Sequence, residues 1–387
     1  MARIAWLSPF PPQRSGVAYY SYWLVKALSP YLHIDLYYDG EEPAAELKDQ
    51  FDSYPVSAFP QQRERYDEVI YHIGNNSIFH KEIYKLAWTF PGTIVLHDYN
   101  ISAFMHHAFY RQADDHLYEQ ALTDGNRDAN LKSFQGLFQR IARSAARFPM
   151  SHALVNRSKR VIVHHRWARD QFINQSHVEV IPLFAKLHYE PSPEEVEAFK
   201  KKFLIKNNHF VLSCLGFINS NKLPKLQIEV ARRLLDNGYP VRLVFAGETA
   251  PEVRRLQAEV QASDYEESIV FTGYLSEIEY SSAIFASDIV INLRNPSMGE
   301  ASATLMHALA AAKPTIISDV AQYREFPDRV CWKLTHDENE AELLFEFITV
   351  LLSNKNVRAA ISDNSTEYVK EVFALDRVVP QWLRVIA

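Results

Sequence analysis

The chain alternates between short apolar runs and amphipathic stretches of helical length, and it does so in two separate series. The first series starts with the apolar run at 2–8, and the second starts with the run at 209–216. Strands separated by helices of about 10 to 15 residues run parallel within one sheet. The alternation therefore predicts an α/β protein with two doubly wound, Rossmann-like domains.

A looser stretch between the two series predicts the domain boundary. The alternation weakens around 185–193, and a charged helical segment follows it. A chain of 387 residues is also long for a single core. We expect a first domain over 1–185, a second domain over 186–370, and a C-terminal helix over 371–387 that returns to the first domain.

The composition excludes several classes of protein. Hydrophobic residues make up 47% of the chain and charged residues 23%, as in globular proteins, and a net charge of −6 gives no general attraction for nucleic acid. No apolar run approaches the roughly 20 residues that a membrane span needs. The N-terminus starts a strand at once and lacks the features of a signal peptide. We therefore expect a cytoplasmic protein that binds no nucleic acid.

The segment 131–169 is strongly basic, with nine Lys and Arg residues and no acidic residue. Residues 137–148 within it place apolar side chains at helical spacing, with arginines on the flanking faces. Such a helix can dock peripherally on an anionic membrane, which for a cytoplasmic protein is the inner face. A core-facing helix with a solvated basic side has the same pattern, and both interpretations stay open.

The stretch 292–319 carries most of the functional information. It has the pattern strand, polar loop, helix, strand, and its loop contains Glu300. In an open parallel sheet, ligands bind at the carboxyl ends of the strands, and a helix N-terminus there favours phosphate. Glu300 would repel phosphate but can accept hydrogen bonds from sugar hydroxyls, so this loop suits a phosphorylated sugar. An ordinary crossover, in which Glu300 only complements the helix dipole, fits the same residues.

Four segments of the chain resemble one enzyme family, and they lie at 8–21, 93–98, 215–225 and 270–319. The last segment is the most specific, because its order of elements and its GE-x-S and KPTIISD motifs recur together in that family. The chain resembles the retaining glycosyltransferases of the GT-B fold, in the large bacterial family 4 or group 1. The resemblance covers nearly the whole chain and implies two Rossmann-like domains that face each other across a cleft.

The resemblance implies a metal-independent hexosyltransferase. It would move a sugar from a nucleoside diphosphate sugar to a glycan or lipid-linked glycan acceptor during surface polysaccharide assembly. The first domain would face the acceptor, the second would bind the donor, and no cofactor is implied beside the donor substrate. Two other function classes fit the same architecture. A sugar-nucleotide 2-epimerase would form product without an acceptor, and a non-catalytic sugar-nucleotide or glycan-binding protein would keep its function in a Glu300→Ala variant.

The resemblance also assigns residues to the transferred sugar. His97 and Asp98 end an apolar strand, and the family places such a His-Asp pair against this sugar. His97 would hydrogen-bond a sugar hydroxyl or support the oxocarbenium-like centre, and Glu300 would be the third catalytic residue. The preceding loop offers either contacts to the acceptor or a turn with local hydrogen bonds. Its candidate residues are Asn75, Asn76 and His80.

A departing diphosphate needs positive charge and N–H donors fixed where its charge develops. Lys222 supplies a point charge, the helix at 303–312 supplies its N-terminus, and Gly16 lets the backbone approach phosphate closely. Without a ligand, Lys222 would be a surface lysine and Gly16 an ordinary loop glycine. The donor-binding candidates, several of them by resemblance alone, are Gly16, Gly216, Asn219, Lys222, Tyr274, Leu275, Gly299, Ala301, Ser302, Ala303, Thr304 and His307.

Two positions depart from the family pattern. The second glutamate of the family is replaced by His307, which would accept ribose hydroxyls only through a neutral ring nitrogen. Phe217 stands where the family has an arginine, which leaves Lys222 as the main cation and Lys225 as a second candidate. The neighbours His164 and His165 look like metal ligands, but neighbours on a strand face opposite ways, and we expect no metal site.

Overall fold

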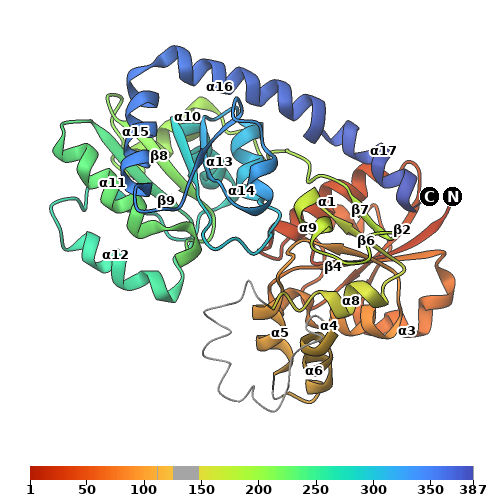
Figure 1. Ribbon diagram of the computed structural model, residues 1–387. Helices are drawn as coiled ribbons and strands as arrows, with labels where there is room; N and C mark the ends of the chain where they lie inside the picture. The colour runs from red at the N-terminus through yellow and green to blue at the C-terminus, as the bar shows by residue number, and fades with distance from the viewer. Residues whose placement is uncertain (111, 125–147, 387) are drawn as a thin grey trace. The chain divides into compact units, whose positions relative to one another are not determined.

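The computed structural model describes residues 1–110, 112–124 and 148–386, and they form two compact units (Figure 1). The first unit contains Met1–Leu183, Met298–Ala301 and Leu375–Ala387. The second unit contains Phe184–Ser297 and Ser302–Ala374. Each unit holds one parallel sheet between helices, so the predicted pair of doubly wound α/β domains is confirmed.

The sheet of the first unit has the strand order β3-β2-β1-β4-β5-β6-β7. The chain begins in the middle of this sheet at β1, moves outward to β3, and returns to β4 on the other side of β1. Open α/β sheets bind ligands at such a change of direction, beyond the carboxyl ends of the strands. The strands are β1 (Arg3–Leu7), β2 (His33–Tyr38), β3 (Ser53–Pro55), β4 (Glu68–Ile73), β5 (Thr93–Leu96), β6 (Arg160–Val163) and β7 (Val178–Val180).

Helices cover both faces of this first sheet. On one face, Trp6 of β1 packs beside Trp382 of α17, with ring centroids 5.5 Å apart, and Figure 1 shows α17 beside α1. On the other face, Tyr71 of β4 lies in a core shared with α4 and α5. The helices are α1 (Gly16–Leu28), α2 (Ala45–Lys48), α3 (Phe59–Gln62), α4 (Ser77–Thr89), α5 (Ser102–Phe109), α6 (Asp115–Asp124), α8 (His152–Arg157), α9 (Arg166–Asp170) and α17 (Leu375–Ile386).

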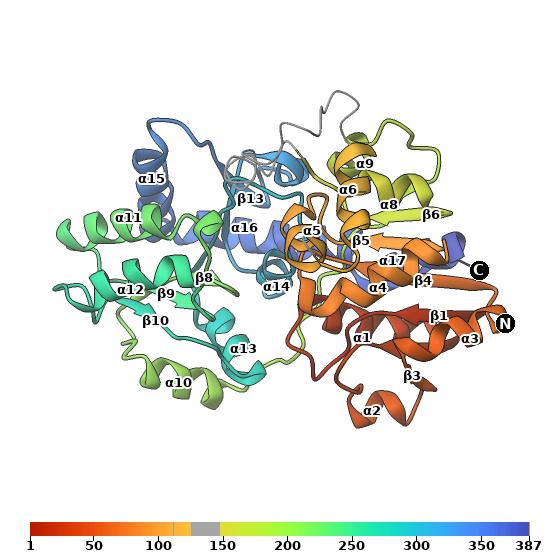
Figure 2. The same ribbon diagram turned by 90° about the horizontal axis from the view of Figure 1, so that it is seen from below.

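The sheet of the second unit has the order β10-β9-β8-β11-β12-β13. Alternate residues of β8 face opposite cores: Cys214 packs with α11 and α15, and Leu215 packs with α10 and α13. Figure 2 shows α10 and α13 on the opposite face of this sheet from α11. The strands are β8 (Phe210–Leu215), β9 (Val241–Ala246), β10 (Ile269–Phe271), β11 (Ile289–Asn292), β12 (Thr315–Ser318) and β13 (Cys331–Leu334). The helices are α10 (Pro193–Lys202), α11 (Pro224–Asp236), α12 (Arg254–Gln261), α13 (Glu277–Ala286), α14 (Ala303–Ala310), α15 (Glu340–Ser353) and α16 (Lys355–Tyr368).

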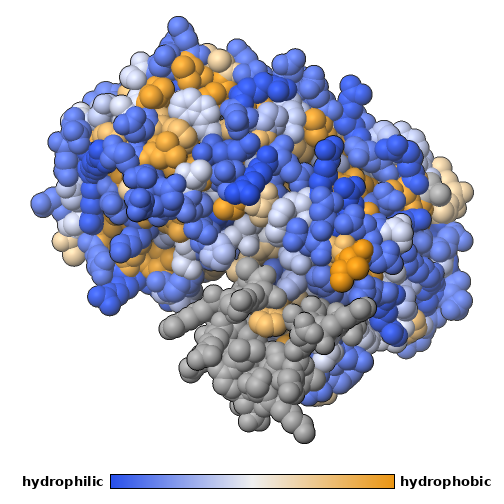
Figure 3. Space-filling view, viewed as in Figure 1, coloured by the Kyte–Doolittle hydropathy of each residue, from blue (hydrophilic) through white to orange (hydrophobic). Residues whose placement is uncertain are grey.

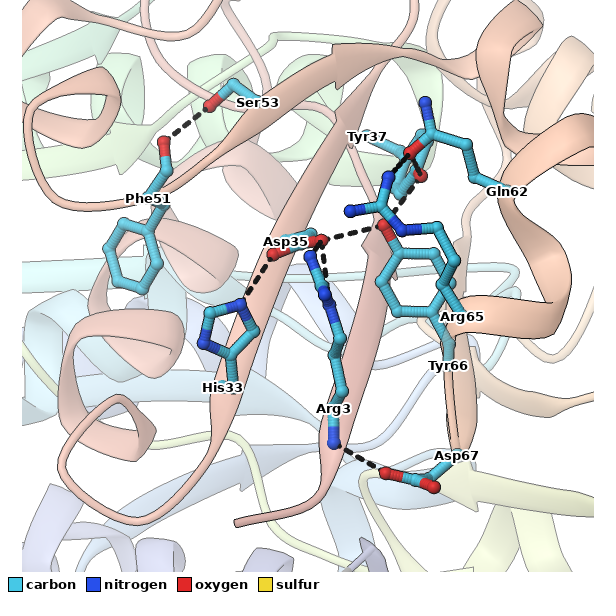
Figure 4. Close-up of polar contacts among 10 residues, drawn as sticks. All are labelled: Arg3, His33, Asp35, Tyr37, Phe51, Ser53, Gln62, Arg65, Tyr66 and Asp67. Atoms are coloured by element: carbon cyan, nitrogen blue, oxygen red, sulfur yellow. Dashed lines mark hydrogen bonds and ion pairs between the residues drawn. The ribbon is translucent and has the colours of Figure 1, made fainter.

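A buried carboxylate, Asp35 on β2, ties together strands of the first sheet (Figure 4). Its Oδ2 accepts hydrogen bonds from the Arg3 guanidinium at 2.8 Å and from the Tyr66 hydroxyl at 2.7 Å. His33, Asp35 and Asp52 offer ligand atoms that all lie within 4.8 Å of one another, which is close enough for a metal ion. The Arg3 charge beside Asp35 opposes a cation there, so we assign this cluster a structural role.

Among the described residues, no helix combines the length and the apolar character that crossing a membrane requires. The face shown in Figure 3 is mainly hydrophilic, with hydrophobic residues in small separate patches. The expected membrane-docking helix at 137–148 falls almost entirely on residues that the structure does not describe, and only its last residue is described. The described part of the basic segment forms α8, β6 and α9.

Candidate active site

The turn that carries Glu300, Met298–Ala301, belongs to the first unit. It pairs with the residues after β5: the Tyr99 N–H donates to the Gly299 carbonyl at 3.1 Å, and the Ala301 N–H donates to the His97 carbonyl at 2.8 Å. Glu300 thereby forms an antiparallel bridge with Asp98. The structure thus brings together the three predicted catalytic residues, which are His97, Asp98 and Glu300.

Gly299 in this turn cannot be replaced without a rearrangement. Its φ of +66° lies in the left-handed region. A Cβ there would lie 2.5 Å from Cζ3 of Trp167 and 2.7 Å from Cβ of Tyr99. Both the backbone conformation and the close approach of two aromatic residues therefore require glycine.

The carboxyl groups of Asp98 and Glu300 have different surroundings. Asp98 is half-buried, and its Oδ2 accepts the Asn75 N–H at 2.7 Å. Burial raises the pKa of Asp98 to about 7; the Asn75 hydrogen bond opposes this rise, and the nearby Glu300 carboxylate adds to it. Oε2 of Glu300 accepts the Met298 N–H at 2.8 Å. Near neutral pH, Asp98 is therefore able both to donate and to accept a proton.

Three histidines, His72, His97 and His164, form a hydrogen-bonded array. Nδ1 of His72 lies 2.9 Å from Nε2 of His97, and Nδ1 of His97 lies 3.1 Å from Nε2 of His164. The array ends where Nδ1 of His164 lies 3.0 Å from the Ile181 carbonyl. Both ring nitrogens of His97 are engaged, so the predicted contact of its ring with a sugar hydroxyl requires the array to open.

Burial keeps these rings neutral. It lowers the pKa of His72 and of His97 well below the usual range, and it lowers the pKa of His164 to about 4. A neutral imidazole has one N–H donor and one acceptor nitrogen. Each ring can therefore join the array as donor on one side and acceptor on the other.

The predicted acceptor contacts make internal hydrogen bonds. Oδ1 of Asn75 accepts the Phe104 N–H at 2.8 Å, and Oδ1 of Asn76 caps α4 by accepting the Ile78 N–H at 2.9 Å. His80 is buried, and its Nδ1 lies 2.9 Å from the His72 carbonyl. These side chains position the loop after β4, and any contact with an acceptor stays a prediction.

Gly16, predicted to approach phosphate, lies exposed at the start of α1 in the first unit. The Ser15 hydroxyl caps this helix by accepting the Val17 N–H at 3.2 Å. The backbone around Gly16 is therefore ordered by a local cap.

In the second unit, several predicted donor residues gather where β8 ends. Gly216 has a φ of +78°, and a Cβ there would lie 2.8 Å from Cγ2 of Thr304 and 3.4 Å from Nζ of Lys222. Lys222 is 3% exposed and donates to the Leu215 carbonyl, so the interpretation as a surface lysine is wrong. The backbone N–H of Lys222 donates to the Asn219 carbonyl at 3.2 Å. A buried ammonium, a close-packed glycine and the first turn of α14 are thus neighbours.

Short polar side chains order the start of α14. Oγ of Ser302 accepts the Leu305 N–H at 3.3 Å, and the Thr304 hydroxyl donates to Oδ1 of Asn292 at 2.9 Å. Ala303 opens the helix. The first N–H groups of a helix lack partners within it and favour an anion, so this turn is chemically suited to phosphate.

The remaining donor candidates lie in different surroundings. His307 is buried in α14, with Nδ1 3.3 Å from the Tyr280 hydroxyl and its ring centroid 4.7 Å from that of His188. Burial lowers its pKa to about 3, so the ring is neutral. Tyr274 is exposed and Leu275 is buried. A ribose contact through His307 would have to use Nε2.

Sequence reasoning missed two residues that hold the Glu300 turn. Nε2 of His165 lies 3.3 Å from the Gly299 carbonyl, and Nδ1 of His165 accepts the Ala168 N–H at 3.1 Å. Trp167 packs against Gly299. From the sequence alone, the pair His164 and His165 suggests only metal ligands, although histidines at the ends of neighbouring strands also indicate that their rings can meet.

Residues 195–368 match the family described as glycosyl transferases group 1. No curated protein sequence matches the chain.

Similar solved structures cover nearly all of the chain. Anabaena Alr3699/HepE in complex with UDP-glucose is 14% identical with a TM-score of 0.68, covering 99% of both chains. A glycosyltransferase from Rickettsia africae ESF-5 is 15% identical with a TM-score of 0.69, covering 100% of this chain and 97% of that one. A putative UDP-N-acetylglucosamine 2-epimerase from Listeria monocytogenes is 12% identical with a TM-score of 0.58, covering 100% and 95%. At such identities the likeness establishes a shared fold and nothing further.

Proposed function

We propose that this chain, which belongs to the glycosyl transferases group 1 family and has the GT-B architecture, moves a sugar from a nucleoside diphosphate sugar to a glycan or lipid-linked glycan with retention of anomeric configuration. One observation carries the proposal. The family match over 195–368 contains Gly216, Lys222 and the start of α14, the residues that are neighbours in the second unit.

The second unit supports a role in holding the donor diphosphate. The buried Lys222 ammonium and the first turn of α14 would stabilise the negative charge that develops as the sugar leaves. Gly216 lets the backbone after β8 lie close to the first turn of α14, because the Cβ of any larger residue would meet Thr304. The complexes of Alr3699/HepE with UDP and with UDP-glucose make a uridine diphosphate sugar our first choice of donor.

The first unit supports a role at the sugar. Glu300 and Asp98 supply carboxyl oxygens that can accept hydrogen bonds from sugar hydroxyls, next to the His97 backbone. We propose departure and attack on the same face of the sugar, with the leaving diphosphate taking the proton of the acceptor hydroxyl. Glu300 and Asp98 then hold the sugar and balance the charge of its oxocarbenium-like transition state.

A donor panel tests this function. Thermal shift and calorimetry with UDP-, GDP-, ADP- and dTDP-sugars would identify the donor, and NMR of the product would give its anomeric configuration. We expect binding of one donor class and transfer only when an acceptor is present. Lack of binding to every donor, or a 2-epimer formed without an acceptor, would overturn the proposal.

In a second arm, Glu300→Gln should abolish transfer while the nucleotide alone still binds. A variant that transfers sugar at the normal rate would remove Glu300 from the proposed mechanism. Surface polysaccharide assembly stays our proposal for the pathway.

A further inference from the structure

We propose that His164 and His165, at the end of β6, are positioning residues that hold the Glu300 turn on the first unit. The inference rests on the proposed function of Glu300. Because neighbouring residues of a strand face opposite ways, the two rings reach different partners. His164 hydrogen-bonds to the His97 ring, and His165 lies beside the Gly299 carbonyl.

The Ile181 carbonyl at one end of the histidine array determines which nitrogen donates and which accepts in each of its hydrogen bonds. A carbonyl oxygen only accepts hydrogen bonds, so His164 must carry its proton on Nδ1 to donate to Ile181. Nε2 of His164 is then an acceptor, and His97 donates to it from Nδ1. His97 accepts at Nε2, so His72 also carries its proton on Nδ1. One backbone carbonyl thus fixes the tautomer of three buried rings.

The tautomer of His165 is fixed independently. Its Nδ1 caps α9 by accepting the Ala168 N–H at 3.1 Å, so the proton lies on Nε2. That N–H points at the Gly299 carbonyl, which also accepts the Tyr99 N–H. Burial lowers the pKa of His165 to about 3, which keeps Nδ1 free to accept.

Both contacts act on Glu300 through the backbone. His164 orients His97, whose carbonyl accepts the Ala301 N–H directly after Glu300. His165 holds the carbonyl of Gly299 directly before Glu300. The backbone on both sides of Glu300 is therefore held in place, and we assign His164 and His165 this positioning role.

Asparagine substitutions can distinguish the two hydrogen bonds of each ring, because asparagine keeps a polar atom near the Nδ1 position and has none at the Nε2 position. In His165→Asn the amide oxygen can still cap α9, and in His164→Asn the amide N–H can still reach the Ile181 carbonyl, but each variant loses its contact at the Nε2 position. We expect kcat to fall about 10- to 100-fold in each variant, with KM for the donor changed less than about threefold. Normal kcat in both variants would overturn the proposal.

His177→Asn is the matched control. Nε2 of His177 lies 3.0 Å from the Val155 carbonyl, so this variant removes a histidine-to-backbone bond elsewhere in the first unit. We expect a loss of thermal stability similar to that of His165→Asn but a normal kcat. An equal fall of kcat in the control would show that the effect is general destabilisation, and it would also overturn the proposal.

NMR of protein labelled with ¹⁵N in the histidine rings tests the array without any activity. We expect the signals that disappear in His72→Asn and His164→Asn to show protonated Nδ1, and the signal that disappears in His165→Asn to show protonated Nε2. The opposite tautomers would refute the proposed bonds. If these tautomers are found but wild-type protein transfers no sugar, the proposed function fails and the array stands.

Discussion

The carboxyl ends of the two sheets are built from different chemistry. In the first unit, neutral imidazoles and aromatic rings at this edge surround the turn that carries Glu300. In the second unit the same edge is made of glycine backbone, short hydroxyl side chains and one buried lysine. The first arrangement fixes a carboxylate without adding charge, and the second concentrates positive potential. We propose that this difference suits a sugar at the edge of the first unit and a diphosphate at the edge of the second.

Of the substitutions that test this difference between the two edges, Gly299→Ala should lower kcat the most. The new Cβ would meet Trp167 and Tyr99 in a backbone conformation that alanine disfavours. We expect kcat to fall at least about 100-fold, because the whole Glu300 turn must shift. Steady-state kinetics with the identified donor measure the effect.

Gly238→Ala is the control for Gly299→Ala. Gly238 has a similar φ of +81°, but nothing lies within 4 Å of the added Cβ. This variant should lose only about 1 to 2 kcal/mol of stability and keep its kcat. If both variants lose activity equally, the close packing at Gly299 has no special role.

The second prediction concerns the buried cation. Lys222→Met should weaken binding of the nucleoside diphosphate about 10- to 100-fold, because a charged hydrogen-bond donor is lost. The exposed Lys225, three residues along the chain, gives the control Lys225→Met, which should bind normally. Calorimetry with UDP measures both variants, and equal affinities would mean that the second unit does not use Lys222 for phosphate.

The third prediction uses the unequal distribution of buried histidines. Strongly lowered histidine pKa values occur at His72, His80, His97, His164 and His165 in the first unit and at His188 and His307 in the second. Such a histidine takes up its proton in the unfolded state first, so stability is highest above its ordinary pKa and falls as the pH drops toward the folded value. Asp98 acts in the opposite direction, because its folded pKa is raised to about 7.

Between pH 7 and pH 6 the first unit should therefore lose about 1 kcal/mol more stability than the second. Hydrogen exchange, corrected for the intrinsic rate at each pH, would measure the two units separately in one sample. An equal loss in both units would show that the histidine array is not the acid-sensitive part of the molecule.

The sequence was sufficient for some features because they are local. Alternating strands and helices predicted both sheets, and the loop after β8 placed Gly216 and Lys222 together because they are close along the chain. The array of His72, His97 and His164 was not predictable in this way. His72 lies in β4, and His97 and His164 directly follow β5 and β6, so the rings meet only through the order of these three strands in the sheet.

The attachment of the Glu300 turn was also beyond sequence patterns. Its residues lie within a stretch that has the periodicity of the second domain, yet their hydrogen bonds go to residues 97–100. Nothing in the local pattern of 298–301 indicates this partner. The sequence does carry one signal, the histidine pair at 164–165, and in the structure this pair makes hydrogen bonds to the His97 ring and the Gly299 carbonyl.

The position of α17 has a consequence for how the protein is made. Trp6 of β1 and Trp382 of α17 lie far apart along the chain, yet both are fully buried and their rings pack against each other. During synthesis Trp6 therefore stays uncovered until α17 has been made. A hydrophobic surface that stays exposed in this way favours the binding of chaperones, and loss of α17 would expose Trp6 again.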